Sequence, residues 1–207
     1  MRLKYYFGRV LVKAKGLDKK PSYASLNEDC TLDWLTGYKE KGTYIDIGAN
    51  HPDECNNTKL FYERGWRGIN IEPDQAGYVL FCEKRPEDIN LNNAIGEGEI
   101  DYFEADHGTT GNTCVKEVAE ARGVKNHRMI KLKPLSEVFQ ENNLHLVDFI
   151  SIDVESFEDA VLKSNDWNTY KARVICLEGY KYDYLKQFGY KKVFWDGVNS
   201  YYKLKSQ

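Results

Sequence analysis

The segment Thr43-Tyr-Ile-Asp-Ile-Gly-Ala-Asn50 gives the clearest indication of the fold. It begins with a short apolar run, as a buried strand does, and it ends in a small turn that contains a glycine. A second apolar run, Gly68-Ile-Asn-Ile-Glu72, follows after a segment with helical spacing from Glu54 to Gly65. A strand, a helix and another strand in this order predict the βαβ unit of a parallel sheet.

The same alternation of apolar runs and amphipathic stretches continues to the end of the sequence, which predicts an α/β fold with helices on both faces of a mostly parallel sheet. The last two runs, separated by Asp196-Gly-Val-Asn199, predict an antiparallel hairpin. A polar segment over 106–126 predicts a loop with a short helix. The other expected strands are Ile89–Ile95, Ile100–Ala105, Met129–Lys133, Leu146–Asp153, Ala172–Glu178, Lys191–Trp195 and Ser200–Leu204, and the other helices Pro73–Lys84, Phe157–Ser164 and Tyr182–Phe188.

Composition narrows the class of protein. The net charge of −3 gives no positive field that would hold nucleic acid, so nucleic acid is not an expected partner. No apolar run approaches the ~20 residues of a membrane span, and the five cysteines form no CxxC pattern. We therefore expect reduced thiols and a cytoplasmic protein.

The beginning of the sequence is basic. We divide the chain into an N-terminal arm and helix over residues 1–40, which pack on the core, and one globular domain over residues 41–207. The basic side chains suit a solvated arm or a contact with an anionic substrate or membrane surface. They are Arg2, Lys4, Arg9, Lys13, Lys15, Lys19 and Lys20, against Asp18 alone.

A ligand site is expected where the first strand ends, because open α/β sheets bind ligands outside the carboxyl ends of their strands. Asp46, Gly48, Ala49 and Asn50 form that turn, where the backbone can approach a ligand closely. Glu72 ends the next strand, where a carboxylate can accept hydrogen bonds from both hydroxyls of a ribose. The spacing predicts a ligand that contains adenosine.

The pattern leaves two adenosine cofactors open, a nicotinamide dinucleotide and S-adenosylmethionine. The turn lacks the GxGxxG glycines that admit a pyrophosphate, which favours a ligand without one. Pro73 follows Glu72 at the same edge of the sheet, and Asn93 and Ala94 lie where a contact to the adenine amino group is expected.

Several ordered segments resemble the FkbM family of S-adenosylmethionine-dependent O-methyltransferases, over residues 22–202. They are Tyr44-Ile-Asp-Ile-Gly-Ala-Asn50, Phe61-Tyr-Glu-Arg-Gly-Trp-Arg-Gly-Ile-Asn-Ile-Glu-Pro73, Arg85-Pro-Glu-Asp-Ile-Asn-Leu-Asn92, Asp148-Phe-Ile-Ser-Ile-Asp-Val-Glu155, Val161-Leu-Lys-Ser-Asn-Asp-Trp167 and Val174-Ile-Cys-Leu-Glu178.

The resemblance implies a Rossmann-like class I methyltransferase fold, whose sheet has seven strands with the last one antiparallel. It implies a sugar hydroxyl of a glycan, glycoconjugate or nucleotide sugar as the methyl acceptor. Asn27 and Glu28 lie in a segment that resembles a family segment near the cofactor. The sequence departs from the family at Ser156, where a glycine is usual.

Methyl transfer to a hydroxyl needs alignment of the reacting groups and a group that takes the hydroxyl proton. Asp153 and Glu178 end two central strands, and Glu155 follows closely, so these carboxylates are our candidate catalytic residues. Asp153 and Glu178 could also hold Mg²⁺ or Mn²⁺. His51 is a further candidate base, as is His107.

Two other functions stay open from the sequence. A non-catalytic interaction module that keeps the adenosine site would bind the cofactor without turnover. An NAD-dependent oxidoreductase is disfavoured by the missing glycines.

Overall fold

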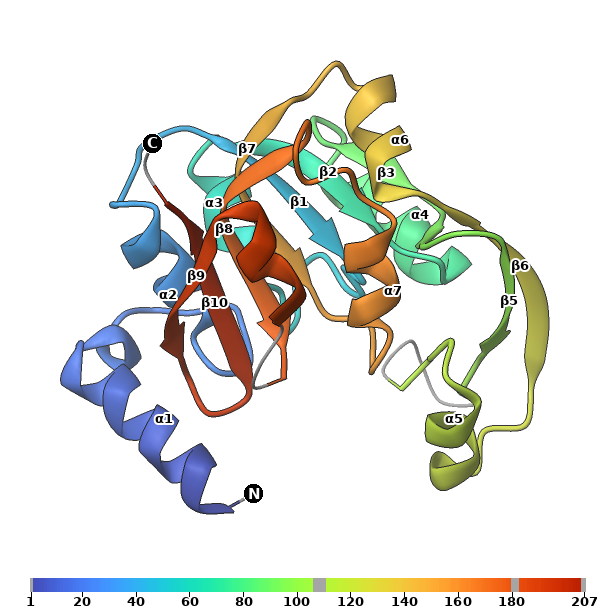
Figure 1. Ribbon diagram of the computed structural model, residues 1–207, viewed down its shortest axis with the longest axis horizontal. Coiled ribbons are helices and arrows are strands. Elements are labelled where there is room, and N and C mark those ends of the chain that lie inside the picture. The colour runs from blue at the N-terminus through green and yellow to red at the C-terminus, as the bar shows by residue number, and fades with distance from the viewer. Residues whose placement is uncertain (1, 106–110, 180–182, 206–207) are drawn as a thin grey trace.

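The computed structural model describes residues 2–105, 111–179 and 183–205 (Figure 1). At its centre lies a seven-stranded sheet in which only the strand over 199–204 is antiparallel to its neighbours. The order of the strands is β3 (Ile89–Leu91), β2 (Arg67–Ile71), β1 (Thr43–Ile47), β7 (Leu146–Ile152), β8 (Lys171–Glu178), β10 (Asn199–Leu204) and β9 (Tyr190–Trp195).

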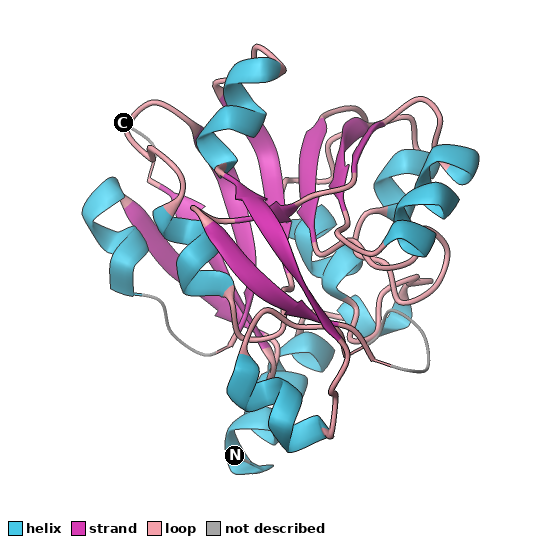
Figure 2. Ribbon diagram, turned by 90° about the vertical axis from the view of Figure 1, so that its right-hand side faces the viewer, coloured by secondary structure: helices cyan, strands magenta, loops and turns pink. Residues whose placement is uncertain are grey.

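Helices cover both faces of this sheet, as Figure 2 shows, which confirms the predicted Rossmann-like α/β fold and its C-terminal hairpin. Their bounds are α1 (Arg2–Ala14), η1 (Leu17–Lys19), α2 (Glu28–Leu35), α3 (Lys59–Glu63), α4 (Gln75–Lys84), α5 (Lys116–Arg122), α6 (Leu135–Glu141), α7 (Glu158–Lys163) and η2 (Asp183–Phe188). None of these described helices is long and apolar enough to cross a membrane.

The sheet has an apolar core on each of its two faces, because successive side chains along a strand point to opposite faces. Ile45 and Ile47 of β1 point to the face that α6, α7 and η2 cover, where they join one buried apolar cluster. Tyr44 of the same strand joins a second cluster with Phe61 of α3 and residues of α1 and α2. Because both faces are buried, the central strands are mostly apolar, with a few polar residues such as Asp46 and Asn70 among them.

The predicted third strand over 89–95 is wrong, because the segment divides into two strands in different sheets. β3 stays in the main sheet, whereas β4 (Ala94–Ile95) pairs with β6 (His127–Lys133), which also pairs with β5 (Glu99–Phe103). Between them, the Asn92 side chain donates hydrogen bonds to the carbonyl oxygens of Glu72 and Pro73. These bonds hold the chain at the end of β2 while its direction changes.

The predicted helix over 54–65 is also wrong at its start, since α3 spans only Lys59–Glu63. Cys55 has a φ of 49°, which no helix continues through. The Oδ1 atom of Asn56 accepts hydrogen bonds from the backbone N–H groups of Thr58 and Lys59. Residues 51–58 are therefore a loop in which Asn56 closes a turn.

The sequence also failed to indicate α6. The predicted helix over 182–188 is the 3₁₀ helix η2, with Tyr182 outside the described residues.

Candidate active site

A pocket lies at the carboxyl ends of β1, β2 and β7, where the order of the strands reverses. It brings together most of the residues that the sequence indicated. The predicted residues that line it are Asp46, Gly48, Ala49, Asn50, Glu72, Pro73, Asn93, Ala94, Asp153 and Glu155.

The turn after β1 is built so that two strands can approach each other closely. Gly48 has a φ of 77°, and a β-carbon at this position would lie 1.9 Å from the carbonyl oxygen of Asp153. The N–H groups of Gly48 and Ala49 donate to the carbonyl oxygen of Ile71. No helix follows this turn directly, because α3 begins only at Lys59.

Glu72 is buried at the end of β2, with 5% of its surface exposed. Its two carboxylate oxygens accept hydrogen bonds from the backbone N–H groups of Asn50, at 2.7 Å, and Asp74, at 2.8 Å. Burial raises the pKa of Glu72 to about 7, although these two hydrogen bonds act in the opposite direction. The bonds fix the position of the carboxylate and join the turn after β1 to the end of β2.

A buried arginine holds the loop over 51–58 beneath the pocket. Arg85 is 2% exposed and donates hydrogen bonds to the side chains of Thr58 and Asn56 and to the carbonyl oxygen of Pro52. Thr58 in turn donates to Asp46 at 2.8 Å, and burial raises the pKa of Asp46 to about 6.

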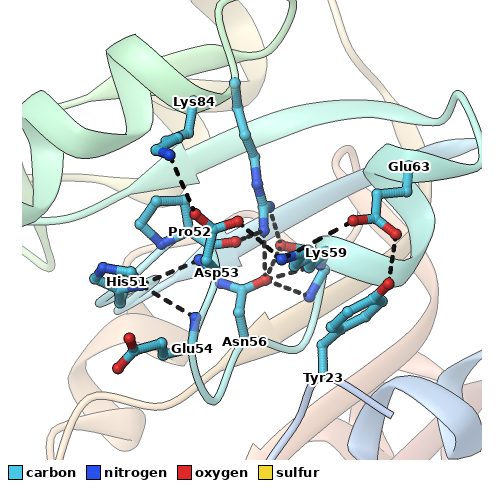
Figure 3. Close-up of polar contacts among 11 residues, drawn as sticks. Tyr23, His51, Pro52, Asp53, Glu54, Asn56, Lys59, Glu63 and Lys84 are labelled. Carbon is cyan, nitrogen blue, oxygen red and sulfur yellow. Dashed lines mark hydrogen bonds and ion pairs between the residues drawn. The ribbon is translucent and has the colours of Figure 1, made fainter. Parts of the chain in front are cut away.

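Figure 3 shows Pro52 and Asn56 of this loop close to Lys59, which forms an ion pair with Asp53 at 2.9 Å. No function was predicted for Arg85, because an arginine just after an amphipathic helix usually lies at the surface. Only its place within a segment that resembles the FkbM family distinguished it.

Three carboxylates meet where β7 and β8 end. The Asp153 carboxyl is surrounded by protein on most sides, and this burial and the neighbouring carboxylates of Glu178 and Glu155 raise its pKa well above the usual value. The residue nevertheless keeps exposed surface in the open pocket, so water screens part of this effect. Burial and the charge of Glu155 likewise raise the pKa of Glu178, which does not line the pocket itself.

The loop after β7 closes one side of the pocket. Glu155 accepts a hydrogen bond from Arg122 of α5 at 2.6 Å, and its carbonyl oxygen accepts one from the Thr113 side chain at 2.9 Å. Glu155 and Ser156 have φ values of 53° and 78°, in the left-handed region that favours glycine. The glycine that the family usually has at position 156 therefore matches the backbone that this loop adopts.

The geometry gives the predicted metal site no support. Within the described ranges, no group of three or more His, Cys, Asp or Glu side chains is arranged to hold a metal ion. Asp153 and Glu178 stay a prediction as metal ligands, since Mg²⁺ is held in many sites by one or two carboxylates together with water. We derive no chemical step through a metal.

Three further predicted residues, His51, Asn27 and Glu28, do not line the pocket. His51 accepts hydrogen bonds at Nδ1 from the N–H groups of Asp53 and Glu54, so that nitrogen holds a turn. The Asn27 side chain accepts from Arg9, and the Glu28 carboxylate accepts from Asn199 and from the N–H of Leu26. His107 lies outside the described residues. None of these positions tests the proposed roles, which stay predictions.

Comparison with known protein families assigns the fold and the pocket to one family. Residues 46–194, most of the chain, match the methyltransferase FkbM domain. The chain belongs to the FkbM methyltransferase family. The matched range begins at Asp46 in the pocket and includes Glu72, Asp153 and Glu178. A search of curated proteins found no match to this methyltransferase.

Proposed function

We propose that this methyltransferase uses S-adenosylmethionine to methylate a sugar hydroxyl of a glycan, glycoconjugate or nucleotide sugar. The charge of the pocket carries the choice of methyl donor. Carboxylates of Asp46, Glu72, Asp153 and Glu155 line it, and none of the described lining residues is Lys or Arg. Such a lining attracts a cationic sulfonium and repels the pyrophosphate of a dinucleotide.

The residues of the pocket fit the parts of this donor. Glu72, fixed by its two backbone hydrogen bonds, would accept hydrogen bonds from the ribose hydroxyls. The turn of Gly48 and Ala49 would pass beside the methionine part, while Asn93 and Ala94 would contact the adenine. When bound, the sulfonium supplies an activated methyl group.

Asp153 would take the proton of the acceptor hydroxyl. Its raised pKa makes its carboxylate a stronger base than an ordinary aspartate, and the bound cation would keep it ionised at neutral pH. Glu155 and Glu178 maintain this charge environment without contacting the reacting atoms. The amides of Asn57 and Asn112, which also line the pocket, can donate hydrogen bonds to sugar oxygens.

Calorimetry with S-adenosylmethionine, its demethylated product and NAD tests the donor. We expect the first two to bind and NAD not to bind. Glu72→Ala should weaken the binding about tenfold or more, since hydrogen bonds to a charged group contribute ~1.5–3 kcal/mol. The matched control is Glu87→Ala, because Glu87 is exposed and pairs with Arg67 outside the pocket. Binding of NAD alone would refute the proposal.

Transfer of a labelled methyl group to a panel of nucleotide sugars and glycans tests the acceptor. We expect a labelled sugar ether that resists mild base, which would hydrolyse a methyl ester. Labelling of a protein or a small amine, with no labelled sugar, would refute the acceptor class while leaving the donor intact. Binding of the donor without turnover on any acceptor would favour the non-catalytic module.

A further inference from the structure

The helix α1 has one face packed on the protein and an opposite face in solvent. Val12 is fully buried, and a β-carbon at Gly8 would lie 2.1 Å from the backbone nitrogen of Gly197, so the helix backbone touches the turn between β9 and β10. Phe7 and Val10 are 63% and 58% exposed. They are three positions apart and therefore share one face of the helix.

The charge of this segment is opposite to that of the rest of the chain. The first twenty residues carry seven Lys or Arg and a single acid, whereas the remaining residues carry 22 Lys or Arg against 31 Asp or Glu. Lys13, Lys15, Lys19 and Lys20 are all exposed. Lys13 and Lys19 form no ion pair with any residue that the structure describes. The positive charge is thus available to an anionic partner.

Exposed apolar side chains on α1, beside exposed lysines on α1 and on the following η1 segment, are the pattern of a helix that lies in a membrane interface. The apolar side chains enter the boundary between headgroups and acyl chains, and the lysines contact anionic headgroups. A nucleic acid would use the lysines but not Phe7 and Val10. A second copy of the chain would bring two basic segments together, which like charges oppose.

The position of α1 relates this surface to the pocket. β9 runs parallel to β8, because both are antiparallel to β10, so the turn that α1 contacts lies at the carboxyl edge of the sheet. The pocket opens at the same edge. In Figure 1, α1 lies beside the end of the sheet where β9 and β10 are joined.

We propose that α1 docks the protein on an anionic membrane surface, with Phe7 and Val10 inserted and Lys13 and Lys19 on the headgroups. The helix lies in the interface and does not span it. The proposal does not depend on the identity of the methyl acceptor. It places the edge of the sheet that carries the pocket toward the lipid surface.

Sedimentation of the full chain with vesicles tests this surface. One set contains phosphatidylcholine alone, and the other contains three parts phosphatidylcholine to one part phosphatidylserine. We expect binding to the anionic vesicles only, and weaker binding as salt is raised. Phe7→Ser with Val10→Ser should abolish detectable binding. Lys13→Gln with Lys19→Gln should weaken it by about fivefold for each lysine.

The matched control is Met129→Ser with Lys131→Gln on β6. Met129 is 62% exposed, like Phe7, and Lys131 is exposed, but Figure 1 places β6 on the other side of the molecule. This pair should bind vesicles as the natural protein does. Thermal melting of each variant shows that it is folded.

Three results would overturn the proposal: no binding of the natural protein to the anionic vesicles, equal loss in the β6 control, or equal binding to both vesicle types. Light scattering tests the alternative that a second copy of the chain binds this face of α1. A dimer that Phe7→Ser with Val10→Ser converts to a monomer, without vesicle binding by the natural protein, would assign the face to a second copy of the chain.

Discussion

At the level of single residues, the backbones of Gly48 and Asp153 bring the turn after β1 close to the segment that carries the candidate base. The carbonyl oxygen of Asp153 occupies the space that a side chain at position 48 would need, and the amide of Asp153 donates to Ile47 at 3.0 Å. The turn and the candidate base are therefore positioned together, and a substitution at either position should displace the backbone of the other.

Replacing Gly48 with alanine should separate the two strands. The new β-carbon would meet the Asp153 carbonyl at 1.9 Å, at a φ of 77° that already disfavours any side chain. We expect no measurable binding of the methyl donor by calorimetry, and a loss of stability of at least ~2 kcal/mol. Gly123→Ala is the control, because Gly123 has a φ of 71° with open space around it. If both variants lose equal stability, backbone conformation alone explains the effect.

Asp153→Asn should remove the proton acceptor and keep the shape of the side chain. We expect kcat to fall by about 10²- to 10⁴-fold, the usual contribution of a general base, with the affinity for the donor nearly unchanged. Single-turnover kinetics beside calorimetry separates the two quantities. A variant that loses donor affinity but keeps its single-turnover rate would contradict the proposed role.

At the scale of elements, the loop over 51–58 depends on Arg85, which approaches it from beyond the end of α4. Arg85→Met should leave the side chains of Thr58 and Asn56 without this buried partner. We expect a loss of stability of about 3 kcal/mol and weaker donor binding, measured by denaturant unfolding and calorimetry. The neighbouring Lys84→Met is the control, since the Lys84 side chain is 57% exposed and forms an ion pair with the surface carboxylate of Asp53 at 3.8 Å. Equal effects of the two changes would refute a specific anchoring role for Arg85.

In the loop after β7, one substitution should raise the free energy of unfolding instead of lowering it. Ser156 is exposed and has a φ of 78°, so glycine there should relieve backbone strain. We expect Ser156→Gly to raise the free energy of unfolding by about 1 kcal/mol, measured by denaturant unfolding. Ser136→Gly within α6 should lower it. A loss of stability at position 156 would show that the serine stabilises the loop through its side chain.

At the scale of the whole molecule, buried carboxyls determine how stability depends on pH. Burial raises the pKa of Asp46 to about 6 and the pKa of Glu28 and Glu72 to about 7 each. The folded protein therefore binds these protons more tightly than the unfolded chain. Their contribution to stability is complete below about pH 4 and is lost as the pH rises to about 7.

The melting temperature should accordingly be higher near pH 5.5 than near pH 8, with each fully buried carboxyl contributing on the order of 1 to 3 kcal/mol. The hydrogen bond from Lys59 lowers the pKa of Asp53, so this carboxylate has the opposite effect, but only in acid below this pH range. Scanning calorimetry at several pH values measures this. A melting temperature that rises between these pH values would contradict the assignment of protonated carboxyls.

The central sheet and the place of the pocket could be predicted from the sequence. Apolar runs such as Thr43–Ile47 indicate strands locally, and Gly48 indicates a turn whose φ of 77° disfavours a side chain. Glu72 and Asp153 could be predicted because the ends of parallel strands meet at one edge. The family resemblance rested on the same local segments, and the match over 46–194 confirmed it.

The anchoring of the loop over 51–58, the closure of the loop after β7 and the separation of β3 from β4 could be seen only in the tertiary structure. Each of these features depends on contacts between residues distant in sequence. Arg85 meets Pro52 across 33 positions, and Arg122 meets Glu155 across the same number. The separation of β3 from β4 depends on a partner strand, β6, which lies much later in the chain. Neither period nor local composition records such contacts, since the chain must first fold to bring those side chains together.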